Sequence, residues 1–246
     1  MHGFAPRLRR RLDGWLDRLA PRGCALCGDA LPPRAFPGVC DGCLVELPGA
    51  RRPRCARCGH PTDRTAPACT ACATDGPVPP VDRTIAAADY APPLDRLVTA
   101  LKFGGELSLA RPIGELVAAA WQGALEPEPL DCLVPVPLGA GRLARRGFNQ
   151  SAEIARAMRA ALPRAPRLRA GALVRLRDTP AQSGLGLEAR RGNLVGCFRA
   201  TLPLHGARIG LVDDVTTSGS TLAEAARALR AAGAARVVAL VAARTP

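Results

Sequence analysis

Residues 209–221 are the stretch that most constrains how this chain can fold. The stretch begins with an apolar run, residues 209–212, which predicts a short buried strand of a parallel sheet. Asp213 and Asp214 follow at the carboxyl end of that strand, and a small loop then runs into an Ala-rich helix. In sheets built from such strand–loop–helix units, ligands bind outside the carboxyl ends of the strands. We therefore expect a ligand site next to the two acidic residues.

The loop after the acidic pair has the composition of a phosphate-binding loop. Its residues are Thr216, Thr217, Ser218, Gly219, Ser220 and Thr221. Backbone N–H groups at a helix N-terminus and short hydroxyl side chains can surround a phosphate, and Gly219 lets the backbone approach it closely. The carboxylates of Asp213 and Asp214 can accept hydrogen bonds from two ribose hydroxyls. A generic strand-to-helix turn and the Mg²⁺-binding strand end of an NTPase are the alternatives, although the sequence contains no GxxxxGK[ST] loop.

Predicted strands and helices alternate from residue 84 onward. Strands are predicted over residues 84–90, 131–137, 208–213 and 236–243. Helices are predicted over residues 94–101, 107–121, 150–161 and 221–232, with Gly233 ending the last one. Residues 173–177 and 193–200 flank a long polar loop. This alternation predicts an α/β domain over residues 81–246, built on a doubly wound parallel sheet.

Four Cys-x-x-Cys pairs within residues 23–76 indicate a metal-binding module. The eight thiols are Cys24, Cys27, Cys40, Cys43, Cys55, Cys58, Cys69 and Cys72. Two such pairs make a tetrahedral site of four thiolates, which is typical of structural Zn²⁺, so we predict two zinc ions in a double zinc ribbon. Sequential pairing is the simplest arrangement, and a cross-braced one, first pair with third and second with fourth, is the alternative. Iron–sulfur clusters and redox thiols are further alternatives. A structural metal ion is the default role, because a segment this small cannot fold on a hydrophobic core alone.

The chain is strongly basic, with 33 arginines, one lysine and a net charge of +13. This balance is compatible with a polyanionic partner such as nucleic acid, an anionic lipid or a phosphorylated ligand. A GC-rich genome that encodes Arg and Ala at many positions is the other explanation. Residues 1–22 predict a basic amphipathic helix, which can lie on a membrane or a nucleic acid, or pack on its neighbour.

The sequence carries no signal for a membrane span or for export. No apolar run approaches the ~20 residues that a transmembrane helix needs. Charged residues interrupt the first twenty positions, so no signal-peptide core is predicted. We therefore expect a cytoplasmic protein, in whose reducing environment the ten cysteines would not form disulfides.

Two further stretches have side chains suited to a pyrophosphate. One lies at the carboxyl end of the strand at 131–137 and in the turn after it, and its residues are Pro135, Val136, Pro137, Arg145 and Arg146. The guanidinium groups of the two arginines can bind phosphate oxygens through paired hydrogen bonds. The alternative for this stretch is a basic turn that only contacts solvent. The other is Lys102, the single lysine, whose compact ammonium suits a crowded pyrophosphate pocket. A chance occurrence is the alternative for Lys102.

The long polar stretch over residues 175–193 is a candidate lid. It contains Gln182, Arg190 and Arg191, whose donors can stabilise developing negative charge. A loop of this length and composition could close over a bound ligand. An ordinary surface hairpin is the alternative.

The motifs, taken together and in order, are similar to those of the ComF family. They are the Cys-x-x-Cys pairs, Leu101-Lys102-Phe103-x-Gly105, Val134-Pro135-Val136-Pro137, Arg146-Gly147-Phe148-Asn149-Gln150, Thr179-x-x-Gln182, Arg190-Arg191-x-Asn193 and Val212-Asp213-Asp214-Val215. Residues 209–221 also resemble the fingerprint of type I phosphoribosyltransferases, which bind phosphoribosyl pyrophosphate (PRPP). The resemblance implies a zinc-binding segment joined to a type I phosphoribosyltransferase-like domain. Ser218 departs from this fingerprint, because many phosphoribosyltransferases have Thr, Ala or Gly there.

The resemblance also implies a role in handling single-stranded DNA during natural competence, or in DNA repair, with proteins of those processes as partners. Two hypotheses follow for the chemistry. In the first, the chain is a PRPP-dependent phosphoribosyltransferase: Asp213 and Asp214 bind the ribose, and the loop at 216–221 binds the 5-phosphate. Lys102, Arg145 and Arg146 would then assist departure of the Mg²⁺-bound pyrophosphate. In the second, the chain binds single-stranded DNA without catalysis and with a strong salt dependence, although aromatic residues make up only 3% of it.

Overall fold

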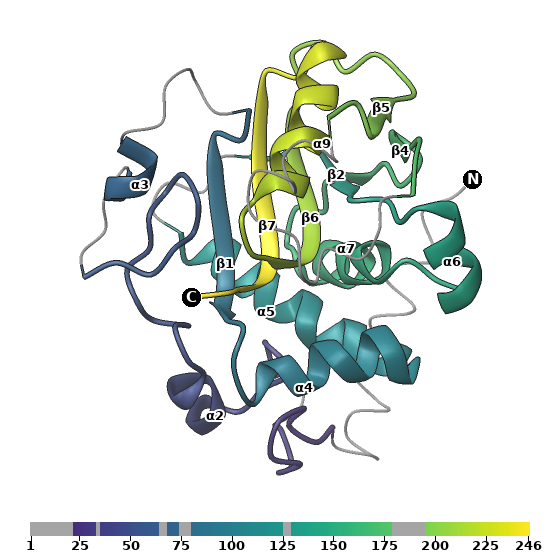
Figure 1. The fold of residues 1–246 in the computed structure, drawn as a ribbon. Helices are drawn as coiled ribbons and strands as arrows, with labels where there is room; N and C mark the ends of the chain where they lie inside the picture. Colours follow the sequence, from purple (N-terminus) through teal and green to yellow (C-terminus); the bar gives the residue numbers. More distant parts are fainter. Residues whose placement is uncertain (1–21, 33–34, 64–67, 74–79, 125–128, 179–194) are drawn as a thin grey trace.

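The computed structural model describes residues 22–32, 35–63, 68–73, 80–124, 129–178 and 195–246 (Figure 1). In this part of the chain, five parallel strands form one sheet in the order β1-β7-β6-β2-β3. The strands are β1 (Arg83–Asp89), β2 (Cys132–Pro135), β3 (Arg167–Leu168), β6 (Arg208–Thr216) and β7 (Arg236–Arg244). The parallel sheet and its crossover helices confirm the predicted α/β fold class.

Helices cover both faces of the sheet and build two apolar cores. α5 (Ala110–Gln122) and α7 (Gln150–Ala161) lie on one face, and α9 (Ser220–Ala231) lies on the other (Figure 1). Successive residues of a strand point to opposite faces, so Val212 packs in the first core and Leu211 in the second. The contact between α5 and α7 depends on Gly114, because a Cβ atom there would lie 2.6 Å from that of Ala157.

β6 is longer than the sequence predicted. The expected strand ended at residue 213, whereas β6 pairs with β7 as far as Thr216, which lies opposite Arg244. Asp213 and Asp214 therefore lie inside the strand, and the prediction that they follow it is wrong. The ladder with β7 continues because the apolar run of β7 is long enough to pair with the polar end of β6.

The helices before α5 differ in type from the expected ones. α4 (Leu94–Thr99) continues into a π-helical turn, η1 (Ala100–Gly104), and a 3₁₀ turn, η2 (Leu107–Leu109), precedes α5. Gly105 ends η1 in the left-handed conformation, with a φ of 70°. The π-helical turn widens the backbone at the position of Lys102, and such turns are frequent at functional sites.

Within the α/β domain, the short elements α6 (Ala140–Arg146) and β3 were not predicted. α6 carries one large apolar residue, Leu143, so it has no apolar periodicity to detect. β3 is two residues long and forms only because β2 lies beside it. The regions at 173–177 and 193–200 contribute β4 (Leu173–Arg175) and β5 (Phe198–Ala200), an antiparallel pair apart from the main sheet.

The first zinc ribbon, which contains α2 (Asp41–Glu46), packs against the α/β domain. Leu31, Val39 and Leu47 belong to the same buried core as Ile113 of α5. The ribbon is therefore part of the folded unit through shared apolar contacts.

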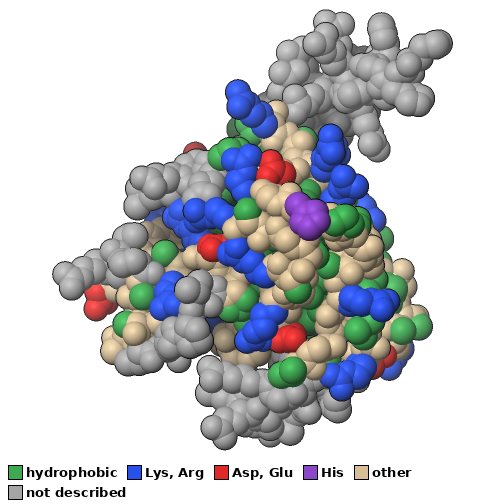
Figure 2. Space-filling view, turned by 90° about the horizontal axis from the view of Figure 1, so that it is seen from above, with side chains coloured by type: hydrophobic (Ala, Val, Ile, Leu, Met, Phe, Trp, Pro, Cys, Tyr) green, Lys and Arg blue, Asp and Glu red, His purple; other side chains and the backbone are tan. Residues whose placement is uncertain are grey.

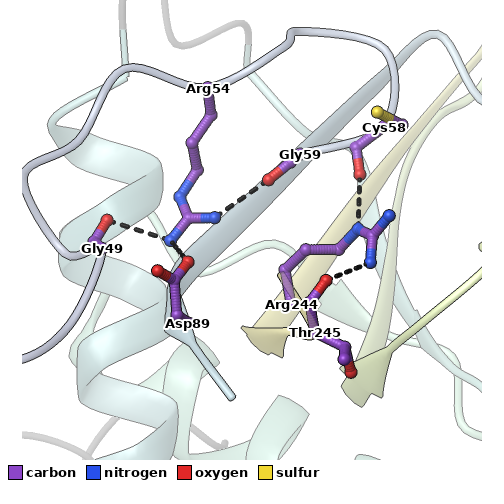
Figure 3. A network of polar contacts seen from close by, with 7 residues as sticks. All are labelled: Gly49, Arg54, Cys58, Gly59, Asp89, Arg244 and Thr245. Carbon is purple, nitrogen blue, oxygen red and sulfur yellow. Dashed lines mark hydrogen bonds and ion pairs between the residues drawn. The ribbon is translucent and has the colours of Figure 1, made fainter. Parts of the chain in front are cut away.

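The second ribbon, which contains α3 (Thr70–Ala73), lies along the edge strand β1. The backbone N–H of Thr84 donates to the carbonyl of Ala56 over 2.8 Å. Figure 3 shows Arg54 between the carbonyls of Gly49 and Gly59, each 2.9 Å away, and the carboxylate of Asp89, 2.7 Å away. Arg244 at the end of β7 donates to the Cys58 carbonyl over 3.2 Å (Figure 3). Arg54 and Arg244 thus join the ribbon to the ends of β1 and β7.

Candidate functional site

Two buried aspartates at the end of β6 form the acidic part of the candidate site. Ser151 Oγ donates to Asp213 Oδ1 over 2.8 Å, and the backbone N–H of Asp214 donates to the same oxygen over 3.0 Å. Burial, reinforced by the charge of Asp214, raises the pKa of Asp213 to about 7, against the opposing effects of Ser151 and Lys102. Ser151 was not predicted from the sequence, because nothing marks a serine of α7 as facing β6. Its contact depends on the packing of that helix against the sheet.

Lys102 joins the acidic pair to the surface. Its ammonium Nζ lies 2.9 Å from Asp214 Oδ2, and both side chains are largely buried. The π-helical turn η1 brings Lys102 to β6, so the structure combines two separately predicted stretches. Asp213 and Asp214 do not line the adjacent cavity, whereas Lys102 does. Lys102 therefore separates the acidic pair from the space that a ligand can enter.

The cavity beside Lys102 is basic and has a volume of about 660 Å³. It is lined by Lys102, Phe103, Gly104, Gly105, Arg142, Arg145, Arg146, Phe148, Arg175 and Thr221. Among the described residues, the lining has five cationic side chains and no carboxylate, so it suits an anionic ligand. Burial lowers the pKa of Arg146 and of Arg175 below the ordinary value, although an arginine stays charged at neutral pH. A cavity of this size fits a small phosphorylated metabolite.

The predicted phosphate loop lies between β6 and α9. Thr216 is buried as the last residue of β6, whereas Thr217 and Ser218 are exposed. Gly219 has a φ of 74°, a conformation that favours glycine, and its carbonyl accepts the first helical hydrogen bond, from Ala223. The hydroxyls of Ser218 and Ser220 lie 2.8 Å apart, and Thr221 reaches the basic cavity. The loop therefore adjoins the cavity at the N-terminus of a helix.

The predicted pyrophosphate turn contributes its arginines to the cavity but not its prolines. Arg145 and Arg146 line the cavity from α6, while Val136 is buried. The side chain of Asn149 donates to the Val136 carbonyl over 3.0 Å and accepts from the Ser151 N–H over 3.1 Å. Asn149 thereby fixes the approach to α7 as its N-cap.

Arg142 and Arg175 line the cavity although the sequence did not mark them as site residues. Arg142 lies four residues before Arg146 in α6. Residues at this spacing share one face of a helix, so the sequence could have indicated that Arg142 lies beside Arg146. Arg175 lies in β4, and only the tertiary structure brings it to α6. The lid residues Gln182, Arg190 and Arg191 lie outside the described residues, as do residues 1–21 of the helix predicted over residues 1–22.

The eight cysteines form two separate clusters. Cys24, Cys27, Cys40 and Cys43 make the first, Cys55, Cys58, Cys69 and Cys72 make the second, and within each cluster all the sulfur atoms lie within 4.8 Å of one another. This geometry corresponds to sequential pairing and not to the cross-braced alternative. Four thiolates at such distances fit tetrahedral Zn²⁺, so each cluster can hold one structural zinc ion.

Both clusters use the same backbone geometry. The N–H of Cys40 donates to Cys24 Sγ over 3.3 Å, and the N–H of Cys69 donates to Cys55 Sγ over 3.1 Å. Burial raises the pKa of the Cys24 thiol, but backbone N–H donors outweigh it and bring that pKa down to about 6. The same balance brings the pKa of Cys55 to about 7. Each cluster therefore contains one thiol with a lowered pKa, Cys24 or Cys55, whereas burial raises the pKa of Cys43 and of Cys72.

Among the helices of the described residues, none combines the length and the apolar character that a membrane span requires.

Comparison with known proteins identifies the family of the chain. Residues 15–73 match the model of a double zinc ribbon domain. DNA utilization protein YhgH of Escherichia coli K12 is 35% identical over 203 residues, which cover 81% of this chain and 87% of that protein. Its counterpart in Salmonella typhi is 36% identical over 204 residues, with the same coverage. Competence protein F of Haemophilus influenzae is 31% identical over 202 residues, covering 80% of this chain and 86% of that protein. The chain therefore belongs to the ComF family.

Proposed function

We propose that the chain binds PRPP, or a closely related ribose phosphate, in the basic cavity. The observation that carries this proposal is the position of the cavity, which lies between the lysine bound to the acidic pair and the helix N-terminus after β6. Backbone N–H groups at Ser220 and Thr221 suit the 5-phosphate. The five cationic side chains suit the pyrophosphate, which carries most of the charge of PRPP.

The acidic pair acts on the ribose in this proposal. Lys102 exchanges Asp214 for the pyrophosphate when the ligand arrives, which leaves that carboxylate free to accept a ribose hydroxyl. Asp213 is held in place by Ser151 and accepts the neighbouring hydroxyl in its ionised form. Transfer of the phosphoribosyl group would develop positive charge on the ribose, and the two carboxylates stabilise that charge.

Mg²⁺ would accompany the pyrophosphate and neutralise part of its charge. The described part of the cavity lining offers no carboxylate, so the oxygens of the ligand itself are the natural ligands of the ion. The residues of the chain then bind the ribose and the 5-phosphate, and the cationic side chains neutralise the remaining charge of the departing pyrophosphate.

The names of the relatives suggest the process that this site serves. The relatives in Escherichia coli and Salmonella typhi are named for DNA utilization, and that of Haemophilus influenzae for competence. We infer a role in the uptake or use of DNA, or in its repair, in the cytoplasm. A phosphoribosyl ligand links such a role to nucleotide chemistry.

Isothermal titration of the zinc-loaded protein with PRPP and Mg²⁺ tests the proposal. We expect saturable binding that weakens at least ~10-fold in Asp213→Asn/Asp214→Asn, because each lost hydrogen bond to a charged group costs about 1.5–3 kcal/mol. Asp131→Asn is the matched control, since Asp131 is an exposed acid that pairs with Arg208 at the beginning of β6. An absence of binding by the intact protein, or equal binding by the double variant, would contradict the proposal.

A second candidate function is the binding of single-stranded DNA without catalysis. Figure 2 shows basic side chains spread across the face seen from above, interspersed with hydrophobic and acidic ones. Phosphate contacts release counterions, so binding through such a surface falls steeply with salt. Oligonucleotide affinity measured between low and moderate salt separates this function from the first. A flat salt dependence would count against it.

A further inference from the structure

Phe103 is the most exposed of the large hydrophobic side chains among the described residues. Its exposed fraction is 78%, and it lines the basic cavity. An apolar ring left in water forgoes the free energy that its burial would give. At the edge of an anion-binding cavity, such a ring is available to a ligand.

The ring is held in position by the residues around it. Leu101, two residues earlier in the π-helical turn, is fully buried and anchors that turn to the core. The guanidinium carbon of Arg146 lies 5.3 Å from the centroid of the Phe103 ring, and Arg146 in turn donates to the side chain of Gln150. Arg146 therefore orients the ring, while most of the ring surface remains open to solvent.

The cavity thus presents two kinds of chemistry side by side. Five cationic side chains suit phosphate groups, and an aromatic face suits the flat surface of a nucleobase. PRPP has no base to stack, so its binding would leave the ring of Phe103 without a role. A 5′-nucleotide carries both a phosphate and a base.

We propose that Phe103 is the stacking platform for the base of a 5′-nucleotide whose phosphate lies in the basic cavity. The nucleotide is either free or the terminal unit of a single DNA strand, since both present the same phosphate and base. This inference rests on the proposed function in one respect: both place the phosphate of the ligand in the same basic cavity. It adds a nucleobase subsite to the phosphate and ribose subsites.

The test compares three ligands on the zinc-loaded full chain: PRPP with Mg²⁺, dAMP, and a short 5′-phosphorylated single-stranded oligonucleotide. We expect Phe103→Ala to weaken dAMP binding roughly 5- to 150-fold, the range for one base–aromatic stack. The affinity for PRPP should stay within about 3-fold, because stacking takes no part in it. Phe103→Trp should keep the affinity for dAMP. The matched control is Leu107→Ala, which removes another exposed apolar side chain, from η2 outside the cavity lining.

Three results would overturn the stacking role. They are an unchanged dAMP affinity in Phe103→Ala, an equal loss for dAMP and PRPP, and a wild-type protein that binds neither dAMP nor the oligonucleotide. If the oligonucleotide binds more tightly than dAMP and Phe103→Ala loses this binding, the stacking role is supported and the ligand is the end of a DNA strand. If dAMP binds more tightly than the oligonucleotide, the role is supported and the ligand is a free nucleotide. A wild type that binds dAMP through Phe103 but not PRPP would overturn the proposed function and leave this inference standing.

Discussion

At the scale of single residues, the candidate site is organised by Lys102. The sequence singles it out as the one lysine among many arginines, and the structure places its Nζ 2.9 Å from Asp214 Oδ2. A lysine suits this position because its ammonium is a compact point charge, whereas the planar guanidinium of arginine needs more room. The same residue lines the cavity, so it lies within reach of both the buried acid and an incoming anion.

The raised pKa of Asp213 predicts a pH-dependent stability. Because the folded-state pKa, about 7, exceeds the ordinary aspartate value of 3.8, the stabilisation by the neutral form is complete below about pH 4 and is lost as pH rises through 7. Between about pH 4 and 7, the free energy of unfolding should fall by up to ~1.4 kcal/mol per pH unit relative to Asp213→Asn. Chemical unfolding of both proteins across pH measures this difference.

Asp214→Asn provides the comparison for that experiment. The charge of Asp214 helps to raise the pKa of Asp213, so its removal should move the pH-dependent loss of stability to lower pH without abolishing it. The same pH profile in the wild type and Asp213→Asn would show that Asp213 does not titrate in this range. That result would contradict the environment derived for the acidic pair.

At the scale of elements, short segments depend most on their neighbours. α6 supplies three of the cationic side chains of the cavity, yet its own sequence has a single large apolar residue. The capping of its N-terminus involves Asp178, whose carboxylate accepts from the Gly141 N–H over 2.8 Å. Asp178 lies far along the chain, so no local pattern could predict this contact.

The junction between the second ribbon and β1 gives a prediction at this scale. Arg54 and Asp89 are mostly buried, with side-chain exposures of 11% and 9%. Arg54→Met would leave the carboxylate of Asp89 without its cation, so we expect a loss of about 3–5 kcal/mol in the free energy of unfolding. Urea unfolding in the presence of zinc, with the zinc content measured in parallel, gives this value.

Arg208→Met is the matched control for the junction. Arg208 also pairs with an aspartate, Asp131, but the two side chains are exposed at 40% and 46%. An exposed pair contributes little, so this variant should lose no more than about 1 kcal/mol. Equal losses in the two variants would mean that burial does not determine the strength of the Arg54 contact.

At the scale of the whole molecule, the zinc ribbons are part of the α/β unit. The first ribbon shares a core with α5, and the second is joined to β1 and β7 by hydrogen bonds. Arg244 binds the Cys58 carbonyl, and the next residue, Thr245, donates to the Thr216 carbonyl over 2.9 Å. The second cysteine cluster is therefore connected to Thr216, where the candidate phosphate loop begins.

Paired cysteine variants test the arrangement of the two sites. In the sequential arrangement, Cys24→Ser/Cys40→Ser removes two ligands from one site, so the protein should keep one zinc ion. Cys24→Ser/Cys55→Ser removes one ligand from each site and should lower the affinity for both ions. A cross-braced arrangement predicts the opposite pair of results. Native mass spectrometry after dialysis counts the ions retained.

The sequence by itself determined the fold class and the cysteines of the two zinc-ribbon clusters, and it located the strand–loop–helix unit of the candidate phosphate loop, because each depends on local pattern. Apolar runs mark parallel strands, and Cys-x-x-Cys turns offer two thiolates to one ion. The loop is recognised from a glycine and hydroxyl residues that are consecutive in the chain. Only the tertiary structure decided which cysteine pairs share a metal, and that Lys102 lies against Asp214. Only the tertiary structure placed Ser151 against Asp213 and Arg175 beside α6. These contacts join residues distant in sequence, and they form when helices pack on the sheet, so the geometry of the site is a property of the packed molecule.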